Sequence, residues 1–460
     1  MHAGAGRSDA MYVGAKPVAG VQPAAAKPGE KAVTVAELES AWSSLSPRQQ
    51  FDAVEQLLRA KRPDVAERLL RGTTYNYPGD AKVARFYLAL AAKGQKRNDE
   101  AIGEFRALLA EDPQFNRVRL ELAHTLYITN QDEAARHHFD LVLGASGTNP
   151  NLESTVRSYL GAIDGRRSWD FSAYFTIAPS TNMNQGGEAR VVYLNGLPFV
   201  INDASLKKSG VGINAGFQGS YRQTINERLD IIYSGGLHTK TFRDDDFNTA
   251  LGTVSVGPRY KFDWGFIGLY GLLENQWHAQ ENYSLSFGGL LSGSVRLGPK
   301  NVLYADLLCS RRRFDDDWNN QDLTYQDGHV CSATGRLDHY VDSATLVRVL
   351  GGGGQERTGL VHLDNDSWFA GAGIYRELPL GLTVYLQALY TDKQYDGDYP
   401  TLTEARHDQR WDFSVNLTKR DWVFWGFAPQ VQYTYTTNAS NVPFHQYDAH
   451  GVNLTFTKRY

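Results

Sequence analysis

Residues 452–460 read VNLTFTKRY, a stretch in which apolar and polar side chains alternate up to a final aromatic residue. Alternation with a period of two places Val452, Leu454, Phe456 and Tyr460 on one face of a β-strand. A last strand left unpaired would be an exposed edge that invites aggregation, unless it closes a barrel against an earlier strand. The stretch therefore favours a closed barrel, and the alternative is the last strand of a soluble sandwich.

The same alternation recurs along the second part of the chain, in segments separated by turn-rich or charged stretches. With their connections the segments average about 21 residues, as in a transmembrane barrel with an even number of strands. They cover residues 169–177, 211–221, 229–237, 254–262, 267–277, 285–297, 303–309, 323–337, 344–350, 368–375, 382–390, 407–417, 425–435 and 452–460. Residues 169–460 are therefore predicted to form an antiparallel outer-membrane β-barrel of about 14 strands.

The composition agrees with this interpretation, although its mean hydropathy of -0.42 resembles that of a soluble protein. The net charge is -4, and no run of 18 apolar residues could make a membrane helix. A barrel needs none, because only alternate residues meet lipid. Most Trp residues lie from Trp169 onward, which suits aromatic girdles at the two membrane interfaces.

The chain before Trp169 has a different character. Residues 1–32 are rich in Ala, Gly, Pro and Lys without apolar periodicity, and we expect a flexible tail. From residue 33 to about residue 165 the apolar period is helical. The given sequence shows no secretory signal, so we expect that a signal peptide was removed or lies upstream, because such a barrel must be exported.

The helical region is repetitive and follows a tetratricopeptide-like pattern with a period of 34 residues. Small residues stand where two antiparallel helices touch, a Phe follows four residues later, and a Pro ends the second helix. In two successive repeats these positions are Ala89, Ala101, Phe105 and Pro113, and then Ala123, Ala135 and Phe139. We therefore expect a short α-solenoid over residues 33–165 in the periplasm, with a generic helical bundle as the alternative.

A solenoid of this class binds peptides on its concave face, so the helical domain is expected to hold a partner. Helix position alone suggests Arg85, Arg119, Glu121 and Asn130 as residues that line such a groove. For each of them, a plain solvated face is the competing interpretation.

The order of a tail, a short solenoid and a barrel resembles the Slam family, the surface lipoprotein assembly modulators. The start of the barrel, SWDFSAYFTIAPSTNMNQ at residues 168–185, is similar to the family's first strand and following segment. The residues that carry this similarity are Trp169, Pro179, Ser180, Thr181, Asn182 and Asn184. The resemblance implies an outer-membrane translocon that delivers particular lipoproteins or related secreted proteins to the cell surface.

In this hypothesis the repeats capture an unfolded client, and the barrel offers it a polar path. The alternatives are an exopolysaccharide exporter, or a passive porin with a periplasmic docking domain. No phosphate-binding loop or nucleophile and base pair stands out, so we expect no enzymatic activity, cofactor, metal or nucleic-acid partner. The expected partners are the client, outer-membrane lipid and, through Val452, Leu454, Phe456 and Tyr460, the barrel assembly machinery.

Cys309 and Cys331 fall on consecutive predicted strands, nearly equidistant from the turn around Asn319 and Asn320. Both occupy the apolar face of their strands, so we expect cross-strand neighbours, either as a disulfide or as two buried thiols. Close to them, Arg residues 311–313 precede Asp residues 315–317, and we expect both runs in a hydrated loop between strands. The functional alternative for these charges is a rim that guides the client or faces lipopolysaccharide.

Overall fold

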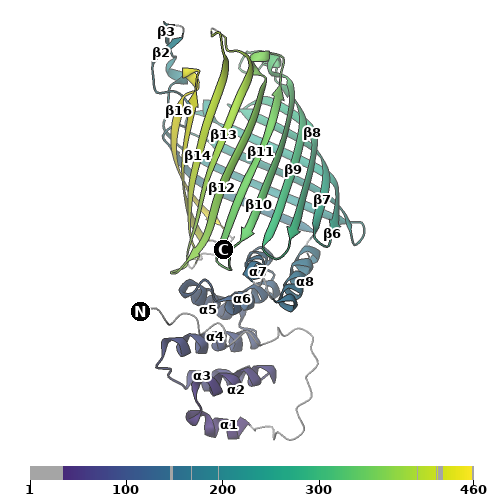
Figure 1. The fold of residues 1–460 in the computed structure, drawn as a ribbon, viewed down its shortest axis with the longest axis vertical. Coiled ribbons are helices and arrows are strands. Elements are labelled where there is room, and N and C mark those ends of the chain that lie inside the picture. The colour runs from purple at the N-terminus through teal and green to yellow at the C-terminus, as the bar shows by residue number, and fades with distance from the viewer. Residues whose placement is uncertain are drawn as a thin grey trace. The chain divides into compact units, whose positions relative to one another are not determined.

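The computed structural model shows a run of helices followed by a closed β-barrel (Figure 1). It describes residues 35–145, 149–166, 168–194, 196–400, 402–420, 422 and 428–457. The expected tail at residues 1–32 and the expected strand position of Tyr460 lie outside these residues. No helix within the described residues is long and apolar enough to span a membrane.

Eight α-helices make up the described part of the N-terminal region, and several begin with proline at the first helical position, where a missing N–H costs nothing. They are α1 (Val35–Ala41), α2 (Pro47–Arg59), α3 (Pro63–Arg71), α4 (Pro78–Gly94), α5 (Asn98–Glu111), α6 (Asn116–Ile128), α7 (Asp132–Ala145) and α8 (Pro150–Arg166). Helix pairs joined by short turns are the unit that the repeat pattern requires.

The residues assigned to repeat packing lie in the interior. Ala101, Phe105, Ala123, Ala135 and Phe139 are completely buried, and Ala89 and Pro113 are buried as well. The small alanines allow two helix backbones to approach closely, while the phenylalanines fill the space beside them.

The chain folds into two compact units. The first contains α1–α4, α5 up to Phe105, and α8 up to Ala162. The second contains the chain from Arg106 to Ala145, with α6 and α7, and the chain from Ile163 onward, with the whole barrel. Two helices of the repeat region therefore belong to the same compact unit as the barrel.

Fourteen antiparallel strands close the barrel in the order β1-β16-β15-β14-β13-β12-β11-β10-β9-β8-β7-β6-β5-β4, which confirms the predicted architecture. The strands are β1 (Trp169–Ser180), β4 (Gly210–Thr224), β5 (Leu229–Thr241), β6 (Thr249–Phe262), β7 (Gly265–His278), β8 (Glu281–Leu297), β9 (Asn301–Phe314), β10 (Gly328–Tyr340), β11 (Thr345–Arg357), β12 (Asn365–Leu378), β13 (Leu382–Asp398), β14 (Ala405–Lys419), β15 (Ala428–Ser440) and β16 (Tyr447–Thr457). A separate hairpin of β2 (Val191–Leu194) and β3 (Leu197–Val200) lies in the long connection after β1.

Apolar side chains point outward along these strands, and polar side chains point inward. On β16, Val452, Leu454 and Phe456 are 41%, 40% and 49% exposed and alternate with Asn453 and Thr455 on the inner face. This is the arrangement of a barrel that has lipid outside and water inside, because the outer face must match hydrocarbon while the lumen need not.

Two sequence-based expectations for the barrel were wrong in position. Leu323 does not begin a strand: β10 starts at Gly328, and Leu323 is buried in the preceding loop, where its N–H donates to the carbonyl of Asp315. The arginines at 311–313 do not lie in a loop but form the last part of β9. In both cases the strand ends were misjudged, because hydrogen bonding of the backbone, and not apolarity, decides where a strand stops.

The seam where the barrel closes lies between β1 and β16. Here Thr176 pairs with Thr455, Ile177 with Leu454, and Ser180 with Gly451. By comparison, β1 pairs with β4 along its whole length from Trp169 to Ser180. Trp169, at the start of β1, is 70% exposed on the outer face.

The segment after β1 folds back across this seam. The buried side chain of Asn182 donates from Nδ2 to the carbonyls of Asp448 and Gly186, both at 2.9 Å, and its Oδ1 accepts from the Gly186 N–H at 3.0 Å. The Thr181 N–H donates to the His450 carbonyl, and the His450 N–H donates to Thr181 Oγ1, both at 2.9 Å. These bonds join the first strand of the barrel to the last one.

Asn184 holds the long connection after β1 in the same way. Its Nδ2 donates to the Leu206 carbonyl at 2.7 Å, and its Oδ1 accepts from the Lys208 N–H at 2.9 Å. Pro179 and Ser180 complete the end of β1, where Ser180 Oγ accepts from the Asn182 N–H at 3.2 Å. The residues of the barrel-start motif thus fasten one end of the seam.

We predict that Asn182→Ala lowers the temperature at which the barrel unfolds. The substitution removes three hydrogen bonds of a buried amide and leaves their backbone partners without it, at a cost of about 1–3 kcal/mol. The temperature can be measured from the heat-dependent mobility of the barrel on SDS gels. Asn151→Ala, at an exposed position of α8, is the control. An equal unfolding temperature for both variants would contradict the role of Asn182 in fastening the seam.

Candidate functional site

The inner face of the barrel contains a polar groove of about 630 Å³. It is formed by β1, β4–β7, β15 and β16, so that it follows the side of the barrel that contains the seam. Its walls are mainly hydroxyl and amide groups, from Thr176, Asn214, Thr239, Thr249, Gln276, Gln432, Asn453 and Thr455. Several of these pair with each other, such as Thr176 Oγ1 with Thr455 Oγ1 at 2.8 Å and Asn453 Nδ2 with Gln432 Oε1 at 2.8 Å.

The inner face of β9–β14 is different, because it carries charged side chains that neutralise one another. Arg348 donates two hydrogen bonds to the carboxylate of Asp338, at 2.7 and 2.9 Å. Arg312 lies 3.4 Å from Glu356. Farther along, Arg410 and Asp412 pair at 2.8 Å. The lumen thus has one arc lined mainly by uncharged polar groups, together with Lys240 and Glu274, and one arc of paired charges.

Helices α6 and α7 pack against one end of the barrel. Leu141 of α7 forms a buried apolar cluster with Val302 of β9, Tyr340 of β10 and Leu346 of β11. The approach is close enough at Gly144 that an added Cβ would lie only 2.2 Å from Cβ of Tyr340, so that only glycine fits there. Apolar burial of this kind fixes the distance between the helix and the ends of the strands.

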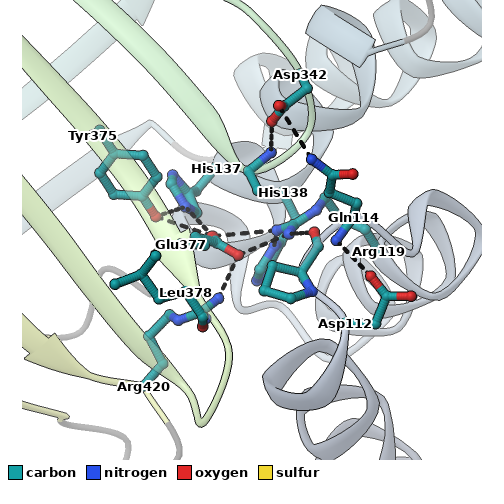
Figure 2. A network of polar contacts seen from close by, with 12 residues as sticks. Asp112, Gln114, Arg119, His137, His138, Asp342, Tyr375, Glu377, Leu378 and Arg420 are labelled. Carbon is teal, nitrogen blue, oxygen red and sulfur yellow. Dashed lines mark hydrogen bonds and ion pairs between the residues drawn. The ribbon is translucent and has the colours of Figure 1, made fainter. Parts of the chain in front are cut away.

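A buried ion pair lies beside this apolar contact (Figure 2). Nη2 of Arg119 on α6 donates to Oε2 of Glu377 on β12 at 2.7 Å, and Nη1 donates to Oε1 at 3.3 Å. Both side chains are fully buried. Nη2 of Arg119 also donates to the Pro113 carbonyl at 2.6 Å, which ties the guanidinium to the turn before α6. The planar fork of arginine suits this two-bond geometry.

Other groups around the Glu377 carboxylate complete its hydrogen bonding (Figure 2). Arg420, just after β14, donates to Oε2 and to the Leu378 carbonyl. Tyr375 donates from its hydroxyl to Oε1 at 3.0 Å, and the same hydroxyl lies 3.2 Å from Nε2 of His137 on α7. A buried carboxylate needs such partners, because each unpaired charge in an apolar interior is costly.

The two adjacent histidines of α7 have separate environments. His137 faces Tyr375, whereas His138 is buried with its Nδ1 3.1 Å from Nη1 of Arg119. Burial and then the positive charge of Arg119 hold the pKa of His138 well below its usual value. Since an arginine only donates, His138 Nδ1 accepts this bond and the ring is neutral.

Further polar contacts tie the helices to several turns at this end of the barrel. The Leu380 N–H, after β12, donates to the carbonyl of Ala110 at 2.6 Å. Gln114 donates to Asp342 at 3.3 Å, as Figure 2 shows, and Arg296 of β8 pairs with Asp140 at 2.7 Å. Helices α6 and α7 are therefore a fixed part of the end of the barrel.

This arrangement corrects one expected client contact. Arg119 cannot line an open peptide groove, because it is completely buried against Glu377. Of the other candidates, Arg85 pairs with Glu104 at 2.5 Å, and Asn130 accepts from Arg166 at 2.9 Å in the turn after α6. Glu121 lies 3.7 Å from Arg117 on the same helix.

Periodicity did not predict the Glu377 network, whose central pair, Arg119 and Glu377, is 258 residues apart in the chain. Two weak signals exist in retrospect. Arg119 stands between Val118 and Leu120 within a helix, and Glu377 precedes Leu378 at the end of an apolar strand. A charged residue at a position that the apolar periodicity places in the interior needs a partner of opposite charge, but the periodicity does not show which residue that partner is.

Cys309 and Cys331 are directly opposite one another on β9 and β10, and a disulfide joins them. It closes a hairpin that the backbone already pairs on both sides of it. Among the residues that the structure describes, no group of three or more His, Cys, Asp or Glu could hold a metal ion.

Comparison with known protein families assigns both parts of the chain. Residues 169–460 match the family model described as "Surface lipoprotein assembly modifier", and residues 48–139 match the model of that family's N-terminal tetratricopeptide repeats. The chain belongs to the surface lipoprotein assembly modifier family. It is an outer-membrane protein that moves lipoproteins to the cell surface, and the resemblance found in the sequence is confirmed.

Individual relatives of this family are distant in sequence but similar in extent. A surface lipoprotein assembly modifier of Pasteurella multocida (strain Pm70) is 24% identical, over 91% of this chain and 87% of the relative. Surface lipoprotein assembly modifier 1 of Neisseria meningitidis serogroup B is 23% identical, over 83% of this chain and 76% of the relative. The hemophilin secretion modulator of Acinetobacter baumannii is 21% identical, over 90% and 89%.

Among solved structures, in-vitro folded OmpT, an outer-membrane protein of Vibrio cholerae, aligns with 63% of this chain and 97% of its own at 9% identity. Its TM-score of 0.37 is too low to carry information about function.

We predict that Arg119→Ala loosens α6 and α7 from the barrel. Removing Arg119 takes two hydrogen bonds and one of two arginine partners from the buried Glu377 carboxylate, at a cost of up to about 3–5 kcal/mol. Hydrogen exchange of the amides of α6 and α7, followed by mass spectrometry in detergent, measures this opening. Arg117→Ala is the matched control: Arg117 is on the same helix, and its 3.7 Å pair with Glu121 is partly exposed, so its loss costs about 1 kcal/mol or less. Similar exchange in both variants would contradict the role of Arg119.

We also predict that lowering the pH weakens this contact. His138 is neutral in the folded state, with its pKa lowered by burial, whereas an unfolded histidine titrates near about 6.5. Below that pH the unfolded state gains a proton that the folded state does not, so stability falls by up to about 1.4 kcal/mol per pH unit.

The measurement is hydrogen-exchange protection of α7 between pH 7.5 and 5.5, corrected for the intrinsic exchange rate. The groups that face His138 are Arg119, His137, Glu377 and Arg106, so the variant His138→Gln isolates the contribution of this histidine. We expect a shallower pH dependence in the variant, and an unchanged slope would exclude His138 as its source.

Proposed function

We propose that the protein is a translocon in which the helical repeats receive a lipoprotein client in the periplasm and the barrel conducts it to the cell surface. Membership of the surface lipoprotein assembly modifier family supports the overall task. The observation that carries the proposed path is the polar groove of about 630 Å³ on the inner face of the barrel.

In this proposal the end of the barrel that holds α6 and α7 faces the periplasm, and the opposite end faces the cell surface. The helices are amphipathic and water-soluble in character, and a client lipoprotein arrives from the periplasmic side. The opposite end contains the loops with acidic runs at 244–246 and 315–317, which suit an exposed hydrated rim.

The groove suits an extended polypeptide. A barrel of 14 strands is wider than the small barrels whose interior is filled by side chains, but narrower than the large porins. An extended chain rises about 3.3 Å per residue and exposes its backbone donors and acceptors. Thr249, Gln276, Gln432 and Asn453 can exchange hydrogen bonds with such a backbone whatever its side chains are.

The hydroxyl and amide groups of the groove also favour release, because they exchange partners with water at small net cost. The groove lining also contains the charged residues Lys240 and Glu274. The paired charges of β9–β14, such as Arg348 with Asp338, are already satisfied by each other. Folding of the client outside the cell supplies the net driving force in this mechanism.

The remaining partner assignments follow from surface chemistry. Val452, Leu454 and Phe456 lie on the terminal strand β16, and these residues together with the aromatic Tyr460 of the sequence are the segment that the barrel assembly machinery would pair with during insertion. The apolar outer face contacts outer-membrane lipid. In the repeats, Arg85, Glu121 and Asn130 are retained as candidate client contacts.

The proposal predicts that a client stalled in transit lies against the groove. A client lipoprotein fused to a domain that is locked by an internal crosslink should stall, because a folded domain does not pass. A photo-crosslinking residue at Gln432, in the groove, should then capture the client on intact cells. The same residue at Tyr433, which is the next residue and points outward, is the matched control.

Three results would contradict this function or its path. Surface display of the client, measured by protease shaving, should depend on this protein. Equal display in cells that lack the protein would show that this client does not need it. Normal display of the locked fusion would reject passage of an unfolded chain. Capture at Tyr433 but not at Gln432 would place the path along the outside of the barrel.

A further inference from the structure

Two arginines at one end of β9 point toward the membrane. The outward-facing residues of β9 are the odd-numbered ones: Leu303 and Leu307 are exposed on the apolar outer face, and Arg311 and Arg313 are exposed on the same face farther along the strand. On the neighbouring strands, Arg311 is opposite Phe287 of β8 and His329 of β10. Both arginines lie within the hydrogen-bonded part of the barrel wall.

Their position along the strand corresponds to the border of the membrane. β9 ends at Phe314, at the end of the barrel opposite to α7 (Figure 1). An outward arginine costs about 2–4 kcal/mol at the middle of the bilayer and about 0–1 kcal/mol near an interface. Arg311 and Arg313 are therefore expected at the depth of the lipid headgroups, with the apolar residues Leu303 and Leu307 in the hydrocarbon layer.

Two nearby arginines of the barrel wall, by comparison, are paired with carboxylates. Arg312, between the two, points into the lumen and lies 3.4 Å from Glu356. Arg357 of β11 lies 2.8 Å from Asp366 and 3.6 Å from Asp396. Within the described part of the chain, by contrast, no carboxylate lies within 4 Å of Arg311 or Arg313.

The surroundings of the two arginines combine cationic and apolar groups. The guanidinium of Arg313 lies over the ring of Phe287, with Cζ 5.7 Å from the ring centre. Leu285 and Phe287, both exposed on the outer face, lie opposite Arg313 and Arg311. A ligand that suits this surface has anionic groups at headgroup depth and acyl chains directly beneath them. Arginine recognises phosphate in particular, through paired N–H donors.

We propose that Arg311 and Arg313 form a binding site for the phosphate groups of a phosphorylated glycolipid of the outer leaflet, the lipid A part of lipopolysaccharide. Its acyl chains lie against Leu291 and Leu307, which are opposite one another farther from this end of the barrel. This inference rests on the orientation given under the proposed function, in which the end of the barrel away from α7 faces the cell surface. The site anchors the barrel in the outer leaflet and is separate from the client path.

The test is binding of lipid A to the full-length protein in detergent, measured by native mass spectrometry. Bisphosphorylated lipid A should bind at least tenfold more tightly than lipid A without phosphates. The double variant R311Q/R313Q should lose most of this difference. The control R357Q/R376Q also removes two outward-facing arginines, one paired with Asp366 and one, at the other end of the barrel, bonded to Thr345, and it should retain the binding.

Several results would overturn the proposal. These are equal binding by R311Q/R313Q and the unmodified protein, equal loss in the control, or no preference for the phosphorylated form. A preference for phosphatidylglycerol over bisphosphorylated lipid A would also overturn it. The heat-dependent gel mobility of each variant shows whether its barrel is folded. No client is present in this experiment. A negative result would therefore overturn the lipid A site but would not bear on the translocation proposal, which the crosslinking and display experiments test.

Discussion

The carboxylate of Glu377 is the interaction on which the joint between helices and barrel depends. It is completely buried and receives hydrogen bonds from Arg119 on α6, Arg420 after β14 and Tyr375 on β12. A buried charge of this kind is stable only while its partners remain in place. Any movement of α6 away from the strands would remove Arg119 from the carboxylate and leave Arg420 and Tyr375 as its partners, so that the ion pair opposes such movement.

The lumen shows the opposite use of charge. On β9–β14, arginine and carboxylate side chains are paired along the inner face, and their fields largely cancel for anything that passes at a distance. On β1, β4–β7, β15 and β16 the groove lining is mainly uncharged, and Lys240 and Glu274 are charged residues within it. A barrel built in this way presents mostly hydroxyl, amide and paired charged groups, which is a useful property for a conduit whose cargo varies in sequence along its length.

The barrel could be predicted from sequence because lipid imposes a period of two on every strand, and this signal survives in 14 separate segments. The strand ends could not, since polar and charged residues such as Arg311 continue the backbone pairing beyond the apolar part, and Leu323 is apolar without being in a strand. Arg119 was misassigned because helical periodicity gives the face of a residue but not the element packed against it. Glu377 had only a weak local signal, its place at the end of an apolar strand, which did not indicate its partner.

The boundary between the two compact units has a consequence for the evolution and engineering of this architecture. Since α6 and α7 belong to the barrel unit, the other unit is made of two separate segments, the chain up to Phe105 in α5 and α8 up to Ala162. Exchange of both segments would place a new receptor module on an intact barrel with its own joint preserved. Recombination at the helix–strand junction would separate Arg119 from Glu377 and combine halves that had not been selected together.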